Sequence, residues 1–213
     1  MSAHQTAVLN ETVLSESMWQ QKGFRWIAGV DEAGRGPIAG PVVAAACIIR
    51  DGARLEGVRD SKALSPQARK RVFWNIITQT LVGVGVVSED EIDRINILNA
   101  SLFAMRKAVL QLPVTPDLLL IDGQFKIDFP TEQIPVIRGD QKLLSVAAAS
   151  IVAKVTRDAI MERFDLQYPQ YGFRKHKGYP TAAHIVSLKT AGPSPIHRMS
   201  FRPVAELIDK EKL

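Results

Sequence analysis

The chain has 213 residues, of which 46% are hydrophobic and 23% charged, a balance typical of a globular protein rather than a disordered or fibrous one. Its net charge of +5 favours an anionic partner without identifying one. The single cysteine, the lack of an apolar run near the ~20 residues of a membrane span and the polar N-terminus argue against disulfide-rich, transmembrane and secreted proteins, so we expect a soluble cytoplasmic protein.

The expected organisation is an N-terminal extension over residues 1–22 followed by one domain over residues 23–213. Apolar residues of the extension have the spacing of one loosely amphipathic helix (Val8, Leu9, Val13, Leu14 and Met18). The domain opens with two short apolar runs, residues 27–30 and 42–49, which we predict to be strands. A loop rich in glycine and proline, residues 34–41, joins these strands as in a hairpin.

Two adjacent carboxylates, Asp31 and Glu32, stand where the first predicted strand ends. Since neighbouring residues of a regular strand point to opposite faces, we expect one of them to lie where the strand breaks, at Ala33-Gly34. The pattern Gly34-x-Gly36-x-x-Ala39 fits the dinucleotide-binding fingerprint, but that motif requires a helix to begin inside it. Prolines and a following strand-like run disfavour such a helix here. A glycine-rich hairpin with a surface acidic pair stays open as the simpler alternative.

The rest of the chain alternates predicted helices and strands. A helix begins at Ser65-Pro66, and the strand over residues 82–87 alternates glycine with valine, which indicates close approach to another backbone. The long helix over residues 142–168 carries a surface of small residues (147–153) that would let it lie close against a sheet. The remaining predicted elements are helices over residues 88–96, 98–111 and 201–213 and strands over residues 118–121 and 134–137.

Acidic residues follow three of the predicted strands: Asp31 with Glu32, Asp122, and Asp140. Taken singly, Asp122-Gly123 is a common turn sequence and Asp140 could cap a helix. As a set they offer hard oxygen ligands, without the cysteines or paired histidines that favour zinc, and such ligands suit Mg²⁺ or Mn²⁺. Two such ions about 3.5–4 Å apart cleave phosphodiesters in many enzymes. Cationic side chains that could contact a phosphate backbone accompany them (Arg35, Lys62, Lys142, Arg174, Lys175, Lys177 and Arg198).

Several long sequence blocks, in the right order from Gly29 to Arg198, resemble type 2 ribonuclease H (ribonuclease HII). A set of blocks is far more specific than one motif. One small departure is Ala63, where the family often has a second lysine. The blocks are Gly29-Val30-Asp31-Glu32-Ala33-Gly34-Arg35-Gly36-Pro37, Asp60-Ser61-Lys62, Asp122-Gly123, Gly139-Asp140, residues 147–158, His176-Lys177-Gly178-Tyr179 and Ser194-Pro195-Ile196-His197-Arg198.

The resemblance implies an α/β ribonuclease H-like fold, with a mixed sheet of about five strands flanked by helices and a helical C-terminal part. It implies an endonuclease that hydrolyses RNA in RNA–DNA hybrids and cleaves 5′ of single ribonucleotides in duplex DNA, as a monomer without membrane association. By this resemblance Asp31, Glu32, Asp122 and Asp140 are the catalytic carboxylates that bind two Mg²⁺ or Mn²⁺ ions. The implied substrate-binding residues are Gly34, Arg35 and Gly36 at the ribose 2′-hydroxyl and adjacent phosphates, Lys62, and Tyr179 at the following deoxyribose.

Two other functions are weighed against this one. A resolvase-like DNase on the same fold would cleave all-DNA duplexes, and the Gly34-Arg35-Gly36 loop argues against it. A non-catalytic hybrid-binding protein would lack part of the acidic set, which is complete here. His176 and His184 are expected on the phosphate side or the surface rather than as metal ligands. The pair His197-Arg198 could either cover the active site or pack the C-terminal helices, and both options stay open.

Overall fold

The computed structural model describes residues 15–58 and 65–211. Most of the helix predicted in the N-terminal extension and the whole Asp60-Ser61-Lys62 motif lie outside the described residues, and Lys62 with it. In the part of the chain that is described, no helix combines the length and apolar character needed to cross a membrane.

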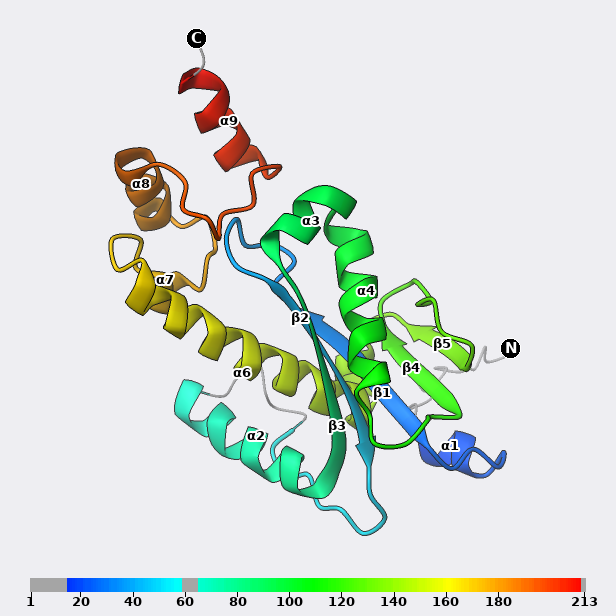
Figure 1. The fold of residues 1–213 in the computed structure, drawn as a ribbon. Helices are drawn as coiled ribbons and strands as arrows, with labels where there is room; N and C mark the ends of the chain where they lie inside the picture. Colours follow the sequence, from blue (N-terminus) through cyan, green and yellow to red (C-terminus); the bar gives the residue numbers. More distant parts are fainter. Residues whose placement is uncertain (1–14, 59–64, 212–213) are drawn as a thin grey trace, which may run out of the picture.

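A five-stranded mixed sheet forms the centre of the fold, as the sequence predicts (Figure 1). Its strands are β1 (Ile27–Ala33), β2 (Val42–Ile49), β3 (Thr80–Val87), β4 (Leu118–Asp122) and β5 (Glu132–Val136), in the spatial order β3-β2-β1-β4-β5. The first three form an antiparallel meander, whereas β4 and β5 run parallel to β1. The carboxyl ends of β1, β4 and β5 therefore meet at the same end of the sheet.

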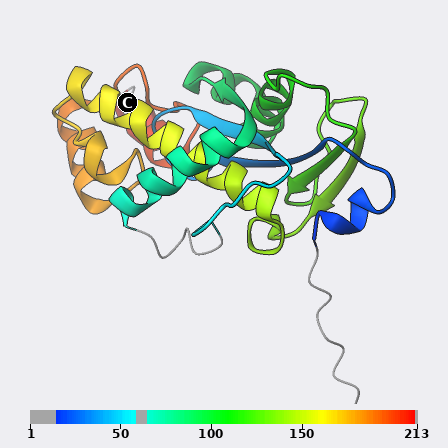
Figure 2. The same ribbon diagram turned by 90° about the horizontal axis from the view of Figure 1, so that it is seen from below.

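Helices cover both faces of this sheet (Figure 1 and Figure 2). Helix α6 (Leu144–Gln167) packs on β1 and β2 with α2 (Pro66–Gln79) beside it, and α4 (Ile97–Leu110) covers the opposite face. A helical C-terminal part then lies beyond one end of the sheet, next to the loop between β1 and β2. The shorter helices are α1 (Ser17–Gln20), α3 (Glu89–Ile95), α5 (Gly139–Lys142), α7 (Phe173–His176), α8 (Ala182–Ala191) and α9 (Arg202–Glu211).

The long helix differs from its prediction at the N-terminal end. The sequence pattern indicates one helix over residues 142–168, but the backbone of Leu143 is extended (φ −123°, ψ 130°) and separates α5 from α6. Leu143 is 1% exposed and packs in a buried cluster with Leu118, Leu120 and Val136. The break thus buries a large apolar side chain, which a continuous helix pattern does not predict.

Residues of the expected N-terminal extension dock on the domain. Trp19 in α1 is buried against Ile27 and Leu118 of the sheet. The Glu16 carboxylate accepts hydrogen bonds from the backbone N–H and the hydroxyl of Ser145, at 2.7 and 2.8 Å. Ser145 lies in the first turn of α6, where backbone N–H groups have no partner within the helix, so Glu16 supplies one from a distant part of the chain.

Glycines allow helices to approach the sheet closely at three positions. A Cβ atom on Gly85 would lie 2.0 Å from the carbonyl oxygen of Ala104 in α4, and one on Gly83 would lie 2.1 Å from that of Ala108. On the other face, a Cβ atom on Gly29 would lie 2.2 Å from the carbonyl carbon of Ser145. The alternation of glycine and valine in β3 therefore has the predicted cause, because α4 lies directly on the backbone of that strand.

Replacing Gly85 by alanine should lower the free energy of unfolding by about 1–3 kcal/mol, because the added methyl group can be accommodated only if α4 moves. The matched control is Val86→Ala on the same strand, where a side chain 41% exposed is shortened and a change within about 0.5 kcal/mol is expected. Urea denaturation measures both. Equal effects of the two substitutions would contradict close contact between β3 and α4.

Candidate active site

The carboxylates that the sequence singles out lie at the common carboxyl end of β1, β4 and β5. The parallel pairing of β1 with β4 ends at Val30 and Ile121, so Asp31 and Asp122 come directly after the last paired residues of the two strands. The expectation that either Asp31 or Glu32 lies at a strand break is wrong, because β1 pairs with β2 through Ala33. Both carboxylates nevertheless lie close enough to Asp122 for its charge to act on them.

Burial and mutual repulsion disfavour the ionised forms of these groups. Asp31 is 5% exposed, and burial raises its pKa well above the ordinary value, with further increases from the charges of Glu32 and Asp122. Burial also raises the pKa of Glu32, although Arg35 opposes this from 3.2 Å. Burying the charges of Asp31 and Glu32 near that of Asp122 costs free energy, which a positive charge placed near them would offset.

Asp122 and Asp140 are linked through the backbone of the turn after β5. The N–H group of Gly139 donates to the Asp122 carboxylate at 2.6 Å, and Asp140, half-buried in the first turn of α5, is the next residue. Across the described ranges, no three Asp, Glu, His or Cys side chains are gathered closely enough to hold a metal ion. The carboxylate oxygens suit Mg²⁺ or Mn²⁺ because they are hard ligands and because a cation would relieve their mutual repulsion. They do not form a closed ligand shell.

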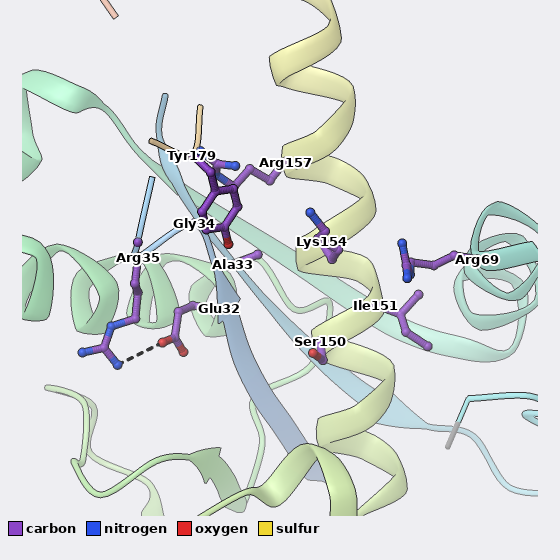
Figure 3. A pocket seen from close by; sticks show the side chains of 11 residues that line it. Glu32, Ala33, Gly34, Arg35, Arg69, Ser150, Ile151, Lys154, Arg157 and Tyr179 are labelled. Carbon is purple, nitrogen blue, oxygen red and sulfur yellow. Dashed lines mark hydrogen bonds and ion pairs between the residues drawn. The ribbon is translucent and has the colours of Figure 1, made fainter. Parts of the chain in front are cut away.

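A cavity of about 440 Å³ lies beside one of these carboxylates, Glu32 (Figure 3). It brings Glu32 together with the predicted loop residues Gly34, Arg35 and Gly36 and with Tyr179, whose side chains and backbone come from segments far apart in the sequence. Tyr179 is 44% exposed. A Cβ atom on Gly36 would touch only the ring of Tyr179, at 3.5 Å. The loop backbone at Gly36 is thus open to a molecule that enters the cavity.

The cavity also contains residues that the sequence analysis did not select. Ser150, Lys154 and Arg157 line it from α6, and Arg69 lines it from α2. The three α6 residues have the spacing i, i+4, i+7 of one helix face. Polar residues at that spacing, in a helix of small apolar residues, were the sequence signal that could have placed them at the site. Ser150 also forms a hydrogen bond that lowers the pKa of Asp31.

Tyr179 lies on a turn that is held by buried histidines. Because the carbonyl oxygen of Tyr179 can only accept, His184 donates to it through Nδ1 at 2.8 Å. His184 Nε2 then accepts from His197 Nε2 at 3.1 Å, and His197 Nδ1 accepts from the backbone N–H of Ser194. The ring of His176 stacks on that of His184. The expectation of a phosphate-side or surface position for His184 is wrong, since it is fully buried.

Acid should destabilise the protein through these two histidines. Burial lowers the pKa of His184 and of His197 from 6.5 to about 4. Between these values the unfolded chain binds protons that the folded chain does not, so the stability contributed by the neutral rings is complete above pH 6.5 and is lost as the pH falls toward 4. Thermal unfolding across this range should show a smaller pH dependence for His197→Gln than for the unchanged protein. Identical slopes would contradict neutral buried histidines.

Comparisons with known proteins agree with this geometry. A family model described as ribonuclease HII matches residues 28–204. The chain is 51% identical over 198 residues to a ribonuclease HII of Geobacter sulfurreducens, covering 92% of this chain and 91% of the relative. It is 46% identical over 211 residues to one of Chlamydia trachomatis serovar A, covering 98% and 97%. A crystal structure of the ribonuclease H2 from Pyrococcus horikoshii OT3 matches with a TM-score of 0.75 at 29% identity, covering 88% of this chain and 99% of that one.

Proposed function

Since the chain belongs to the ribonuclease HII family and is therefore a ribonuclease H endonuclease acting on RNA paired with DNA, we propose that it also cleaves duplex DNA on the 5′ side of a single embedded ribonucleotide. The products are a 3′-hydroxyl and a 5′-phosphate. One observation carries the proposal: the cavity that Glu32 lines is also lined by the Gly34-Arg35-Gly36 loop and by Tyr179. A carboxylate of the acidic set therefore lies next to a stretch of backbone that a sugar can approach closely.

We assign the chemical step to Asp31, Glu32, Asp122 and Asp140. Two Mg²⁺ or Mn²⁺ ions bound to these carboxylates would supply activation of water and stabilisation of the leaving oxygen. Support comes from the raised pKa values of Asp31 and Glu32, which reflect buried acids lacking enough positive charge nearby. Arg35 offsets part of the charge of Glu32, and the Gly139 N–H group keeps the Asp122 carboxylate beside Asp140.

Recognition of ribose is assigned to the loop and to Tyr179. The 2′-hydroxyl is what distinguishes a ribonucleotide within DNA, and recognising it through the backbone requires a close approach to the sugar. Gly36 has no side chain to prevent that approach, and its backbone lies near the Tyr179 ring. The ring and hydroxyl of Tyr179 are available to the deoxyribose that follows the ribonucleotide.

A second cavity of about 250 Å³ extends the proposed nucleic acid site, since Arg69 lines both cavities. Its acidic residues are fewer than its cations, and two of the cations form ion pairs: Lys177 with Glu162 and Arg174 with Asp165. A phosphate backbone is the partner that such a lining favours. The cations are Arg69, Lys70, Arg174, Lys175 and Lys177.

Two duplexes that differ by one 2′-hydroxyl test the proposal. With Mg²⁺ or Mn²⁺ present, the enzyme should cut only the duplex containing the ribonucleotide, and only on its 5′ side. Asp31→Asn, Asp122→Asn and Asp140→Asn should each slow cleavage by about 10²-fold or more, because each removes a carboxylate that would hold the metal ions. Asp128→Asn is the matched control, since its side chain is 97% exposed.

Thermal unfolding separates loss of chemistry from loss of fold. Without metal, Asp31→Asn should melt at the same temperature as the unchanged protein or higher, because the substitution removes a buried charge. Added Mg²⁺ should stabilise the unchanged protein more than this variant.

In the cleavage assay, equal cutting of both duplexes would favour a resolvase-like DNase. Binding without cutting would favour a non-catalytic hybrid-binding protein.

A further inference from the structure

The side chain of Arg198 is fully buried behind the loop that lines the cavity. Its guanidinium group uses all five N–H donors on backbone carbonyls of that loop. Nη2 donates to Gly34 at 2.6 Å and to Gly40 at 2.7 Å, Nη1 donates to Arg35 at 3.1 Å and to Pro37 at 2.7 Å, and Nε donates to Gly40 at 2.9 Å. Its earlier assignment to a phosphate backbone is therefore wrong, because no part of the cation faces the cavity.

Further contacts fix the same loop from behind. The backbone N–H of Arg198 donates to the carbonyl of Ile38 at 2.9 Å. Arg157 donates to the carbonyls of Pro41 and Ala39, at 2.9 and 3.0 Å, and to the carbonyl of Lys177, at 2.9 Å. Arg157 thus connects the loop to the turn that carries Tyr179. Most carbonyl groups of the loop therefore accept hydrogen bonds from one of these two arginines.

The orientation of these carbonyls determines where the amide groups point. In a trans peptide the C=O of one residue and the N–H of the next point in opposite directions, and the described chain contains no cis peptide bond. Holding the carbonyls of Gly34 and Arg35 against the buried guanidinium therefore turns the N–H groups of Arg35 and Gly36 away from it, toward the cavity. Arg35 and Gly36 both line the cavity to which we assign the ribose.

From this geometry we propose that Arg198 is a positioning residue for ribose recognition, which aims the amides of Arg35 and Gly36 without touching substrate. The inference rests on the proposed function of the loop. Five carbonyl contacts in one plane require the fork of a guanidinium, and a lysine ammonium offers only three donors. The Phe201 ring, 4.9 Å from the guanidinium carbon, packs against the same group. The sequence left two roles open for Arg198, covering the active site or packing the C-terminal helices, and the proposed positioning role is neither of them.

The experiment measures binding in an Asp122→Asn background, in which cleavage is slow enough for binding to reach equilibrium. Fluorescence anisotropy gives the affinity for two duplexes that differ by one 2′-hydroxyl. The Asp122→Asn parent should prefer the ribonucleotide duplex by about tenfold or more, the effect of one or two well-placed hydrogen bonds. Adding Arg198→Lys should reduce this preference to near one, while affinity for the all-DNA duplex stays within about threefold, since phosphate contacts are retained.

Controls distinguish positioning from folding. Arg202→Lys is the matched control, because Arg202 is on the same C-terminal segment with its side chain 88% exposed, and it should keep the preference. A general loss of folded protein would weaken binding to both duplexes equally. Arg198→Gln, which keeps two donors without a charge, replaces Arg198→Lys if the lysine variant does not melt cooperatively.

Each outcome has one meaning. An unchanged preference in a folded Arg198 variant, or loss of cooperative folding in both variants, overturns the positioning role. If the Asp122→Asn parent itself shows no preference for the ribonucleotide duplex, the proposed ribose recognition fails instead, and the positioning role fails with it for that separate and recognisable reason.

Discussion

The contact between α6 and β1 is the constraint on which the site depends. At Gly29 the two elements touch backbone to backbone, with no room for a Cβ atom. This contact sets the distance between the first turn of α6 and the sheet. One face of the helix consequently brings Ser150 to the buried Asp31 and Arg157 to the loop after β1. Moving α6 outward by the width of a methyl group would draw Ser150 away from Asp31 and Arg157 away from the loop.

The acidic cluster and the loop are stabilised in opposite ways. The backbone of the loop is held in one conformation, since two buried arginines donate hydrogen bonds to its carbonyl groups. The charges of the carboxylates lack enough positive charge nearby. Burial and repulsion disfavour them, and Arg35 offsets only part of this cost at Glu32. Such an arrangement is expected where a site must keep its geometry while taking up a cation. The rigid part is the loop to which we assign recognition of ribose.

Local sequence patterns predicted the sheet and the positions of its acidic residues well. Short apolar runs followed by Asp122 or by Asp31 and Glu32 are visible in the sequence, and parallel strands bring their ends together. The alternation in β3 likewise indicated a close neighbour. Local patterns gave a wrong prediction at two places. Leu143 interrupts the predicted helix because its side chain is buried, and the strand continues through Glu32 because it pairs with β2. The roles of Arg198 and His184 depend on partners that local spacing does not reveal: Arg198 contacts a loop some 160 positions away in the chain.

The central claim is that the loop backbone recognises ribose, and Gly36→Ala tests it most directly. The added methyl group has only the Tyr179 ring within reach, at 3.5 Å, so the fold should keep its melting temperature. The cavity side of the loop would no longer admit a sugar at close range. The account predicts that kcat/KM for a duplex with one embedded ribonucleotide falls by about 10²-fold, while affinity for the matched all-DNA duplex is unchanged. Full activity of a folded Gly36→Ala protein would contradict recognition of ribose by this loop.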